Sequence, residues 1–152
     1  MDNIFLLNLK NTDLIAKVSI CWTNQVSNYI WYLGKNGYPF TFINGCRIQL
    51  HRYIHWLNNN YWTNLYVDHI NRDKLDATNI NLREATAAEN SYNKTYKNSN
   101  HNIKYNKSTN TYTVSIQKNK IKHNINNIKS IDDAKLIYKM MAEELFGTFA
   151  PI

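Results

Sequence analysis

Residues 65–90 read LYVDHINRDKLDATNINLREATAAEN, and this stretch decides the fold of the middle of the chain. Leu65–Ile70 and Leu82–Ala85 are short apolar-rich runs separated by a loop rich in Asn and Asp, which is typical of two short strands. Thr86 and Glu89 then have the spacing of a capping box, which predicts that a helix begins there. We therefore expect the order strand, loop, strand, helix.

Four polar side chains have ordered positions in this stretch. Asp68 and Asn90 carry oxygens that suit a hard divalent cation, and His69 can accept a proton near neutral pH. Asp68 and His69 share one expected strand, and we expect Asn90 to face them from the first turn of the helix. Asp68 and His69 alone would also fit an ordinary surface pair. With Asn81 and Asn90 in order behind them, they predict a one-metal hydrolytic site.

The bulk composition is that of a folded protein. The chain has 152 residues, of which 43% are hydrophobic and 13% aromatic, so it can bury a core. No stretch approaches the ~18 apolar residues of a membrane span, and the first residues have no secretory pattern, so we expect an intracellular protein without a membrane partner. Cys21 and Cys46 form no Cys-x-x-Cys pair. We therefore expect no structural zinc, and we interpret both as buried apolar thiols.

Positive charge is concentrated in the second part of the chain. The net charge of the chain is +7. Residues 1–93 hold eight basic and seven acidic residues, whereas residues 94–152 hold ten basic and four acidic residues. This asymmetry favours a nucleic-acid partner for the second part, and a solvated basic face is the alternative. The segment 94–122 has no acidic residue and seven lysines: Lys94, Lys97, Lys104, Lys107, Lys118, Lys120 and Lys122.

The first 50 residues predict a small sheet. Asn44 and Gly45 form a tight hairpin signal, and a helix over 51–58 follows the last strand. We expect a core role rather than base stacking for four aromatic residues, Trp22, Tyr29, Trp31 and Tyr32. The expected strands are Leu14–Ile20, Tyr29–Leu33, Tyr38–Ile43 and Arg47–Leu50.

The last 50 residues predict a three-stranded sheet with one helix across its back. The middle strand alternates apolar residues with Thr111, Thr113, Ser115 and Gln117, which indicates a half-buried strand. Ser130 caps the helix, Gly147 ends it, and Ala134, Ile137, Tyr138, Met141 and Leu145 form one apolar stripe along it. The expected strands are Ile103–Tyr105, Tyr112–Gln117 and Lys120–Ile125.

Residues 47–93 resemble the HNH nuclease family, in its phage and intron homing-endonuclease branch. The matching segments are Leu50-His51-Arg52, Val67-Asp68-His69-Ile70-Asn71, Lys74-Leu75-Asp76, Asn79-Ile80-Asn81-Leu82-Arg83, and Thr86 with Glu89-Asn90. The resemblance implies a ββα-metal core with four catalytic residues. Asp68 and Asn90 would bind the metal, His69 would be the general base, and Asn81 would tie the loop to the strand and hold the histidine.

Residues 96–150 resemble the plant Apetala/ethylene-response-factor DNA-binding domain, which also occurs attached to HNH homing nucleases. The match lies in the Tyr112–Ile116 strand, Asp133-Ala134, Ile137-Tyr138, Ala142 and Glu144-Leu145-Phe146-Gly147-Thr148-Phe149-Ala150. We therefore expect an α+β protein in three parts. Residues 1–93 would hold the N-terminal strands and the nuclease core (about 47–93), residues 94–102 a linker, and residues 103–152 the DNA-binding domain.

These resemblances imply a metal-dependent endonuclease of a phage, virus or mobile element, located in the cytoplasm or nucleus of a host cell. The expected partner is double-stranded DNA and the expected cofactor is Mg²⁺, for which Mn²⁺ can substitute. A monomer with one site should nick, with a dimer left open, and cutting should fall below pH ~6 as a histidine base becomes protonated. The alternatives are a catalytically inactive, DNA-binding regulator and an RNA-binding or structural basic protein.

Basic side chains and the polar face of the sheet supply the expected DNA contacts. Lysines would bind phosphate in a salt-sensitive manner, and the sheet face would enter the major groove; an ordinary solvated sheet face is the alternative. The expected DNA-contacting residues are His51, Arg52, Arg72, Lys74, Arg83, Lys94, Lys97, Lys104, Lys107, Thr111, Thr113, Ser115, Gln117, Lys118, Lys120 and Lys122.

Overall fold

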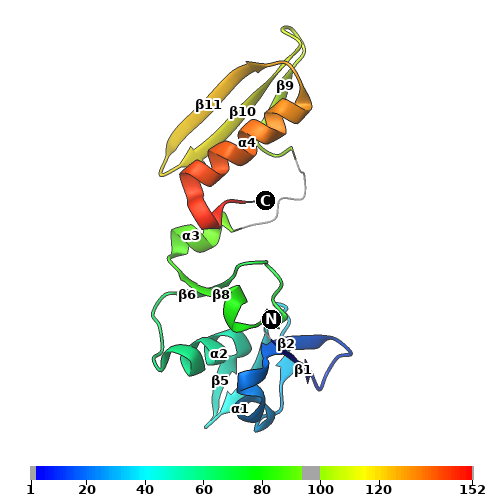
Figure 1. The fold of residues 1–152 in the computed structure, drawn as a ribbon, viewed down its shortest axis with the longest axis vertical. Coiled ribbons are helices and arrows are strands. Elements are labelled where there is room, and N and C mark those ends of the chain that lie inside the picture. Colours follow the sequence, from blue (N-terminus) through cyan, green and yellow to red (C-terminus); the bar gives the residue numbers. More distant parts are fainter. Residues whose placement is uncertain (1–2, 94–99, 152) are drawn as a thin grey trace. The chain divides into compact units, whose positions relative to one another are not determined.

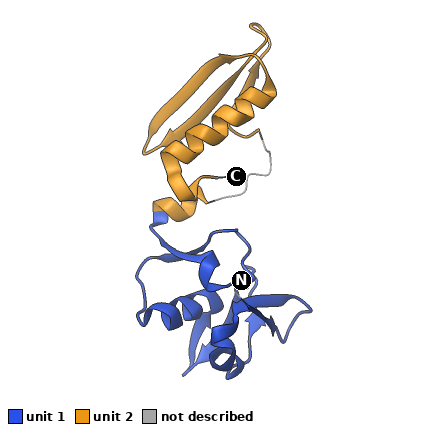
Figure 2. Ribbon diagram, in the orientation of Figure 1, with its two compact units in different colours: residues 1–87 blue, residues 88–152 orange. Residues whose placement is uncertain are grey.

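The computed structural model describes residues 3–93 and 100–151 and has an α+β architecture of several small sheets and four α-helices (Figure 1). The chain forms two compact units, residues 1–87 and residues 88–152 (Figure 2). Lys94 and Lys97 lie outside the described residues, as does most of the expected linker over 94–102. In the described residues, no helix is long and apolar enough to cross a membrane.

The first sheet of the N-terminal unit joins segments that are far apart in sequence. β1 (Ile4–Asn8) pairs antiparallel with β2 (Ile15–Ser19), and β2 pairs in parallel with the two-residue β7 (Asp76–Ala77). The sequence IFLLN of β1 has no polar–apolar alternation, which explains why the pattern did not predict this strand. β7 fixes the middle of the expected loop to the start of the chain.

The second sheet has the order β3 (Tyr32–Leu33), β4 (Pro39–Ile43) and β5 (Cys46–Gln49), all antiparallel. Asn44 and Gly45 have φ values of 49° and 78°, so the predicted hairpin turn is confirmed. The expected strand Tyr29–Leu33 is reduced to its last two residues, because α1 (Thr23–Ser27) ends directly before it and the Tyr29 amide bonds to a carbonyl of that helix.

One helix contributes three residues, Leu50, Tyr53 and Ile54, to the core of this unit. α2 (Leu50–Asn59) confirms the predicted helix, and its Leu50 and Ile54 are fully buried against Trp31. Burial of such a side chain contributes about 1.5–3 kcal/mol. The helix ends at Asn60, which has the left-handed φ of 60° that Asn tolerates.

Two expectations about core residues are wrong. Tyr32 does not join the core; it lies on the opposite face of its sheet, against Phe40 at 5.9 Å between ring centroids. Cys21 and Cys46 are exposed free thiols rather than buried ones. Trp31, in contrast, is 1% exposed and its Nε1 donates to the Val26 carbonyl at 2.8 Å, as a core tryptophan requires.

A two-stranded antiparallel sheet follows α2. β6 (Tyr66–His69) pairs with β8 (Leu82–Ala85), and the 3-10 turn η2 (Asn79–Asn81) leads into β8. The bounds of β8 are those predicted. α3 (Ala87–Tyr92) begins after Thr86, as the capping pattern predicted, and it packs in the second unit, where Tyr92 and Phe146 are 4.4 Å apart between ring centroids.

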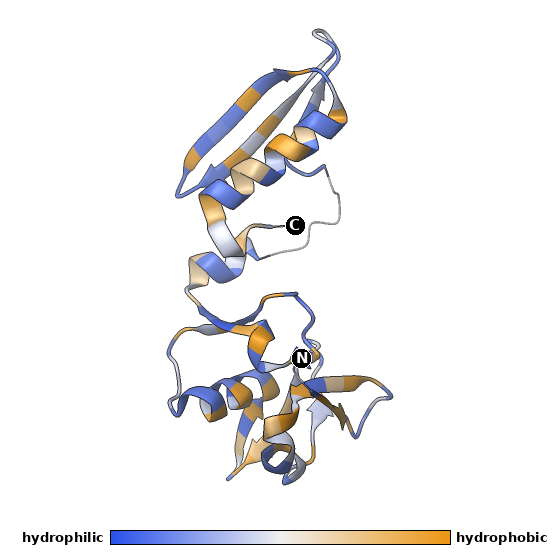
Figure 3. Cartoon of the chain, viewed as in Figure 1, coloured by the Kyte–Doolittle hydropathy of each residue, from blue (hydrophilic) through white to orange (hydrophobic). Residues whose placement is uncertain are grey.

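The second unit is an antiparallel sheet with a helix across one face (Figure 1). The sheet has the order β11 (Ile121–Ile128), β10 (Thr111–Lys118) and β9 (Ile103–Asn106), and the helix is α4 (Ile131–Phe146). Val114, Ile128 and Ala134 form its core. Figure 3 shows hydrophobic bands separated by hydrophilic residues along β11. Ser130 caps α4 by accepting from the Asp133 amide at 3.0 Å, as predicted.

Candidate active site

The ladder between β6 and β8 places Asp68 directly opposite Arg83. Nε and Nη2 of Arg83 both donate to Oδ2 of Asp68, each at 2.9 Å. The side chains of Asp68 and Arg83 are 9% and 14% exposed, so the pair lies largely out of water. Arg83 was expected to contact DNA; in the structure its guanidinium binds a buried carboxylate of the same unit.

His69, at the end of β6, is packed among rings. It is 5% exposed, and its ring centroid is 4.9 Å from that of His51 on α2 and 5.8 Å from that of Tyr38. Tyr38 and His51 are 5.0 Å apart, so the three rings form one cluster. His51 was also expected to contact DNA; at 5% exposure it is instead part of this cluster.

Burial sets the charge state of both histidines. It lowers the pKa of His69, against the raising effect of the nearby carboxylates of Asp68, Asp76 and Asp73. Burial, together with the nearby groups of His69, Arg52 and His55, lowers the pKa of His51 to about 3. Both imidazoles are therefore neutral at pH 7, which is the form of His69 that can accept a proton.

Asn81 fastens the loop that follows His69. Its Nδ2 donates to the Asp76 carbonyl at 2.7 Å, its Oδ1 accepts from the Asn71 amide at 2.9 Å, and its carbonyl accepts from the Ile70 amide at 2.8 Å. Its side chain is buried, with the residue 6% exposed. These three bonds hold the start and the middle of the loop against the residue that precedes β8.

A second loop covers the same region. Lys74 Nζ donates to the Asn36 carbonyl at 2.9 Å and lies 4.6 Å from the centroid of the Tyr38 ring. Burial raises the pKa of Tyr38, and the charge of Asp68 raises it further. The ring of Tyr38 therefore connects His69 to the turn between β3 and β4. Sequence reasoning missed it, since a lone tyrosine before a strand gives no local signal.

A carboxylate network supports α2 from β8. Glu84 accepts from the Tyr61 hydroxyl at 2.8 Å and lies 3.4 Å from Nε2 of His55. Hydrogen bonds from Thr63 and Tyr61 lower the pKa of Glu84. His55 is 7% exposed and takes part in this structural contact.

Asp68 offers the right donor chemistry for a hard cation. Both Arg83 bonds end on Oδ2, and carboxylate oxygens are the ligands that Mg²⁺ prefers. Within residues 3–93 and 100–151, no three His, Cys, Asp or Glu side chains converge as a metal-binding group. A Mg²⁺ ion at Asp68 would therefore keep much of its water, which is its usual behaviour. Asn90, the other expected ligand, lies half-buried on α3.

Two further cationic residues have structural partners. Arg52 donates from Nη2 to the Thr63 carbonyl at 2.7 Å and from Nη1 to the Leu65 carbonyl at 3.2 Å, so it braces the segment before β6. Lys118 turns to the helix side of its sheet, where Nζ donates to the Leu145 carbonyl at the end of α4. Lys118 was expected to contact DNA; in the structure it points to the helix side of the sheet.

The other expected DNA-contacting residues that the structure describes in the second unit lie on the open face or edges of the sheet. Val114 and Ile116 point to the helix, so Thr111, Thr113, Ser115 and Gln117 point away from it, as predicted. Register places two lysines on that same open face, Lys104 beside Thr113 and Lys122 beside Gln117. Lys107 and Lys120 are exposed in the turns. In the N-terminal unit, Lys74 is exposed and Arg72 is half-buried with a φ of 65°.

Comparison with known proteins gives one strong similarity. The chain is 46% identical over 148 residues to a protein of Acanthamoeba polyphaga mimivirus that is named as an uncharacterized HNH endonuclease. The similarity covers 96% of this chain and 78% of the relative. No family model and no solved structure matches the chain. The shared sequence thus extends through both compact units.

Proposed function

Because the chain belongs to the HNH endonuclease family, we propose that it hydrolyses phosphodiester bonds of double-stranded DNA with a divalent metal ion, one strand at a time. The observation that carries this proposal is the buried, neutral His69 beside Asp68, at the end of a strand whose following loop is fastened by Asn81. A base, an acidic ligand and a fixed loop are what such hydrolysis requires of a protein.

The metal would be Mg²⁺, with Mn²⁺ as a substitute, and Asp68 would hold it. When bound, it would neutralise the charge that develops on the phosphodiester and on the leaving 3′ oxygen. The family resemblance adds the amide oxygen of Asn90 as a second ligand. With so few protein ligands, binding should depend on a DNA phosphate, since Mg²⁺ is commonly held by one or two carboxylates together with substrate phosphates.

His69 would accept a proton from the attacking water, a step worth about 10²–10⁴ in rate. Its lowered pKa keeps the imidazole in the accepting form to a lower pH than an ordinary histidine. The rings of Tyr38 and His51 pack beside the imidazole of His69 and would restrict its rotation. The products would carry a 5′ phosphate and a 3′ hydroxyl.

We assign DNA binding in part to the open face of the sheet of the second unit. Its Lys104 and Lys122 are exposed, and the face between them is polar, with Thr113, Ser115 and Gln117. Such a face suits phosphate contacts beside base edges in the major groove. In this proposal the nuclease core lies within 47–93 and the second DNA-binding module within 103–152.

Conversion of supercoiled plasmid to open circles tests the activity. We expect nicking with Mg²⁺ or Mn²⁺, none with EDTA, and none above background for His69→Ala. Leu6→Ala, at an exposed position on β1, is the matched control and should nick like the native chain. If His69→Ala nicks as fast as the native chain, the assignment of the base is wrong.

A catalytically inactive DNA-binding protein is the second candidate function. One observation favours it: the guanidinium of Arg83 already neutralises the carboxylate that would hold the metal. The same plasmid assay separates the two, when it is combined with a gel-shift measurement. DNA binding without conversion to open circles, at any concentration of Mg²⁺ or Mn²⁺, would support the inactive protein.

A further inference from the structure

The outward face of the β3–β4–β5 sheet is unusually aromatic. Strand pairing puts Tyr32, Phe40 and Gln49 in one row across the sheet, and Phe42 and Arg47 in the next. The residues between them, such as Thr41 and Ile48, point to the core instead. Phe42 is 58% exposed, although it lies in the middle strand. Phe42 is not part of the hydrophobic core of the unit, and an exposed apolar patch of this kind can mark an interaction site.

Arg47 lies over the Phe40 ring on this face. Its guanidinium carbon lies 3.9 Å from the centroid of the Phe40 ring, which is the geometry of a cation–π stack. Phe42 stands edge-on to Phe40, at 84° and 5.8 Å. Gly34 makes room for the guanidinium, because a Cβ there would come within 2.7 Å of Nη2 of Arg47. The planar cation is thus fixed beside an exposed ring.

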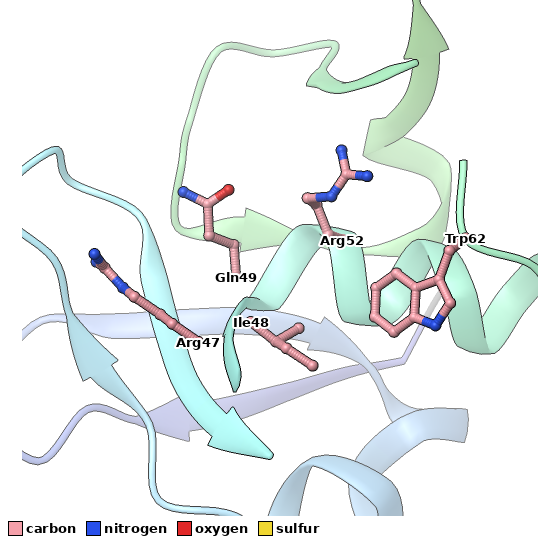
Figure 4. Close-up of a pocket in the computed structure, with 5 residues that line it drawn as sticks. All are labelled: Arg47, Ile48, Gln49, Arg52 and Trp62. Atoms are coloured by element: carbon pink, nitrogen blue, oxygen red, sulfur yellow. The ribbon is translucent and has the colours of Figure 1, made fainter. Parts of the chain in front are cut away.

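Two open hollows meet at Arg47. One, of about 610 Å³, is lined by Phe40, Phe42, Arg47, Lys35 and the turn around them. The other, of about 360 Å³, is lined by Arg47, Ile48, Gln49, Arg52 and Trp62, and Figure 4 shows Arg47 and Trp62 on either side of Ile48. Their lining includes three cations, Lys35, Arg47 and Arg52, and no acidic residue. Both volumes lie within the range of small-ligand sites.

We propose that this face binds unpaired nucleotides of single-stranded DNA, which stack on Phe42 and on the guanidinium of Arg47. Exposed rings and planar guanidinium groups are the surfaces on which unpaired bases stack, and a cationic groove follows the backbone. Trp62 adds a further ring: it is 49% exposed and is itself stacked on Trp56, at 5.5 Å and 13°. The inference rests on the proposed function in taking DNA as the polymer.

Charge and shape favour an unpaired strand over other partners. A duplex keeps its base faces inside the stack, so Phe42 could not reach them without opening it. A second copy would leave the cations that line the two hollows, Lys35, Arg47 and Arg52, without complementary charge, since its matching surface is equally basic. A single-stranded nucleic acid can stack its bases on the aromatic rings and pair its phosphates with the cations.

Binding to an oligothymidylate of about 12 nucleotides, with EDTA present, tests the proposal on the full chain. We expect Phe42→Ala and Arg47→Lys each to weaken this binding by about 5- to 150-fold, the range for loss of one stacked base. Affinity for a duplex of equal length should not change. Phe42→Trp should retain binding, and Leu6→Ala, 57% exposed on another sheet of the same unit, is the control. A 2-aminopurine in the oligonucleotide should be quenched by the native chain and not by Phe42→Ala.

Three results would overturn the proposal. Equal losses on the oligothymidylate and the duplex would mean that the face holds phosphate only. Unchanged affinity in both variants, with circular dichroism like that of the native chain, would mean that the face does not bind DNA. A native dimer that Phe42→Ala converts to a monomer, with oligothymidylate binding intact, would assign the face to a second copy. Because EDTA removes hydrolysis from the assay, a chain that fails to nick plasmid counts against the proposed function alone.

Discussion

Arg83 binds Asp68 through two hydrogen bonds of 2.9 Å from Nε and Nη2 to one carboxylate oxygen, across adjacent strands of a two-stranded sheet. The pair is largely out of water, so the guanidinium is the counter-ion that makes a buried carboxylate tolerable in the absence of a metal. In the proposed enzyme it would also orient Asp68 before the cation binds. The stability of this part of the fold and its affinity for metal are thereby linked.

Arg83→Gln removes that counter-ion. We expect the free energy of unfolding in EDTA to fall by about 3–5 kcal/mol, because the carboxylate of Asp68 is left buried and uncompensated. Millimolar Mg²⁺ should restore part of the loss in this variant more strongly than in the native chain, since the ion then supplies the missing positive charge. Urea unfolding with EDTA and with MgCl₂ measures both effects.

The double variant Asp68→Asn/Arg83→Gln is the control for this pair. With the charge removed, it should be more stable than Arg83→Gln and should not respond to Mg²⁺. A double variant that is stabilised by Mg²⁺ as strongly as Arg83→Gln would place the metal away from Asp68.

Asn81→Ala should loosen the loop behind His69. The variant leaves the part-buried Asp76 carbonyl and Asn71 amide without their side-chain partner, at a cost of about 0.5–1.5 kcal/mol for each hydrogen bond lost. Hydrogen exchange should show faster exchange of the Asn71 amide, and plasmid nicking should fall because the loop no longer fixes the end of β6.

Asn79→Ala is the matched change in the same 3-10 turn. Its side chain bonds instead to Nε1 of Trp22, at 2.9 Å, and to Sγ of Cys21. We expect it to lower stability while leaving the Asn71 amide protected. If both variants speed the exchange of the Asn71 amide equally, the hydrogen bonds of the Asn81 side chain are not what fixes the loop.

His51→Leu should alter the dependence of stability on pH. Because burial lowers the pKa of His51 to about 3, the unfolded chain binds one more proton than the folded chain between about pH 6.5 and pH 3. Stability therefore falls as pH drops through this window, by about 1.4 kcal/mol per pH unit. Between pH 7.5 and pH 5.0 the native chain should lose about 2 kcal/mol more than His51→Leu in urea unfolding. Equal losses would mean that His51 is not held neutral.

Local signals explain what the sequence predicted well. The bounds of β8, the capping of α4 by Ser130 and the hairpin at Asn44-Gly45 each depend on residues within four positions of one another. The alternation of polar and apolar residues predicted which face of β10 carries Thr113 and Ser115. In each case the interaction that stabilises the element is between near neighbours in the chain.

Long-range packing explains what the sequence could not predict. β7 exists because Asp76 and Ala77 pair with Lys17 and Val18, nearly 60 residues earlier, and two residues carry no strand pattern of their own. An arginine in a basic region looks the same whether it meets DNA or, like Arg83, a carboxylate of its own chain. Which of these occurs depends on register and burial, and both arise only from the folded structure.

Lys118 and Lys122 are only four positions apart, and replacing each with Ala should distinguish a lysine that contacts DNA from one that stabilises the helix. Lys122 pairs with Gln117 on the open face of the sheet, so its removal should weaken duplex binding and reduce the magnitude of the salt slope, d log K/d log[salt], by about 0.9. Lys118 instead bonds to the C-terminal end of α4, where a cation offsets the helix dipole. Its removal should leave the salt slope unchanged and lower stability by about 0.3–1 kcal/mol. Titrations of one duplex at several salt concentrations, with urea unfolding of the same three proteins, measure both quantities. A salt slope that changes equally in both variants would mean that Lys118 also reaches phosphate, and that the face of the sheet does not decide which lysines bind DNA.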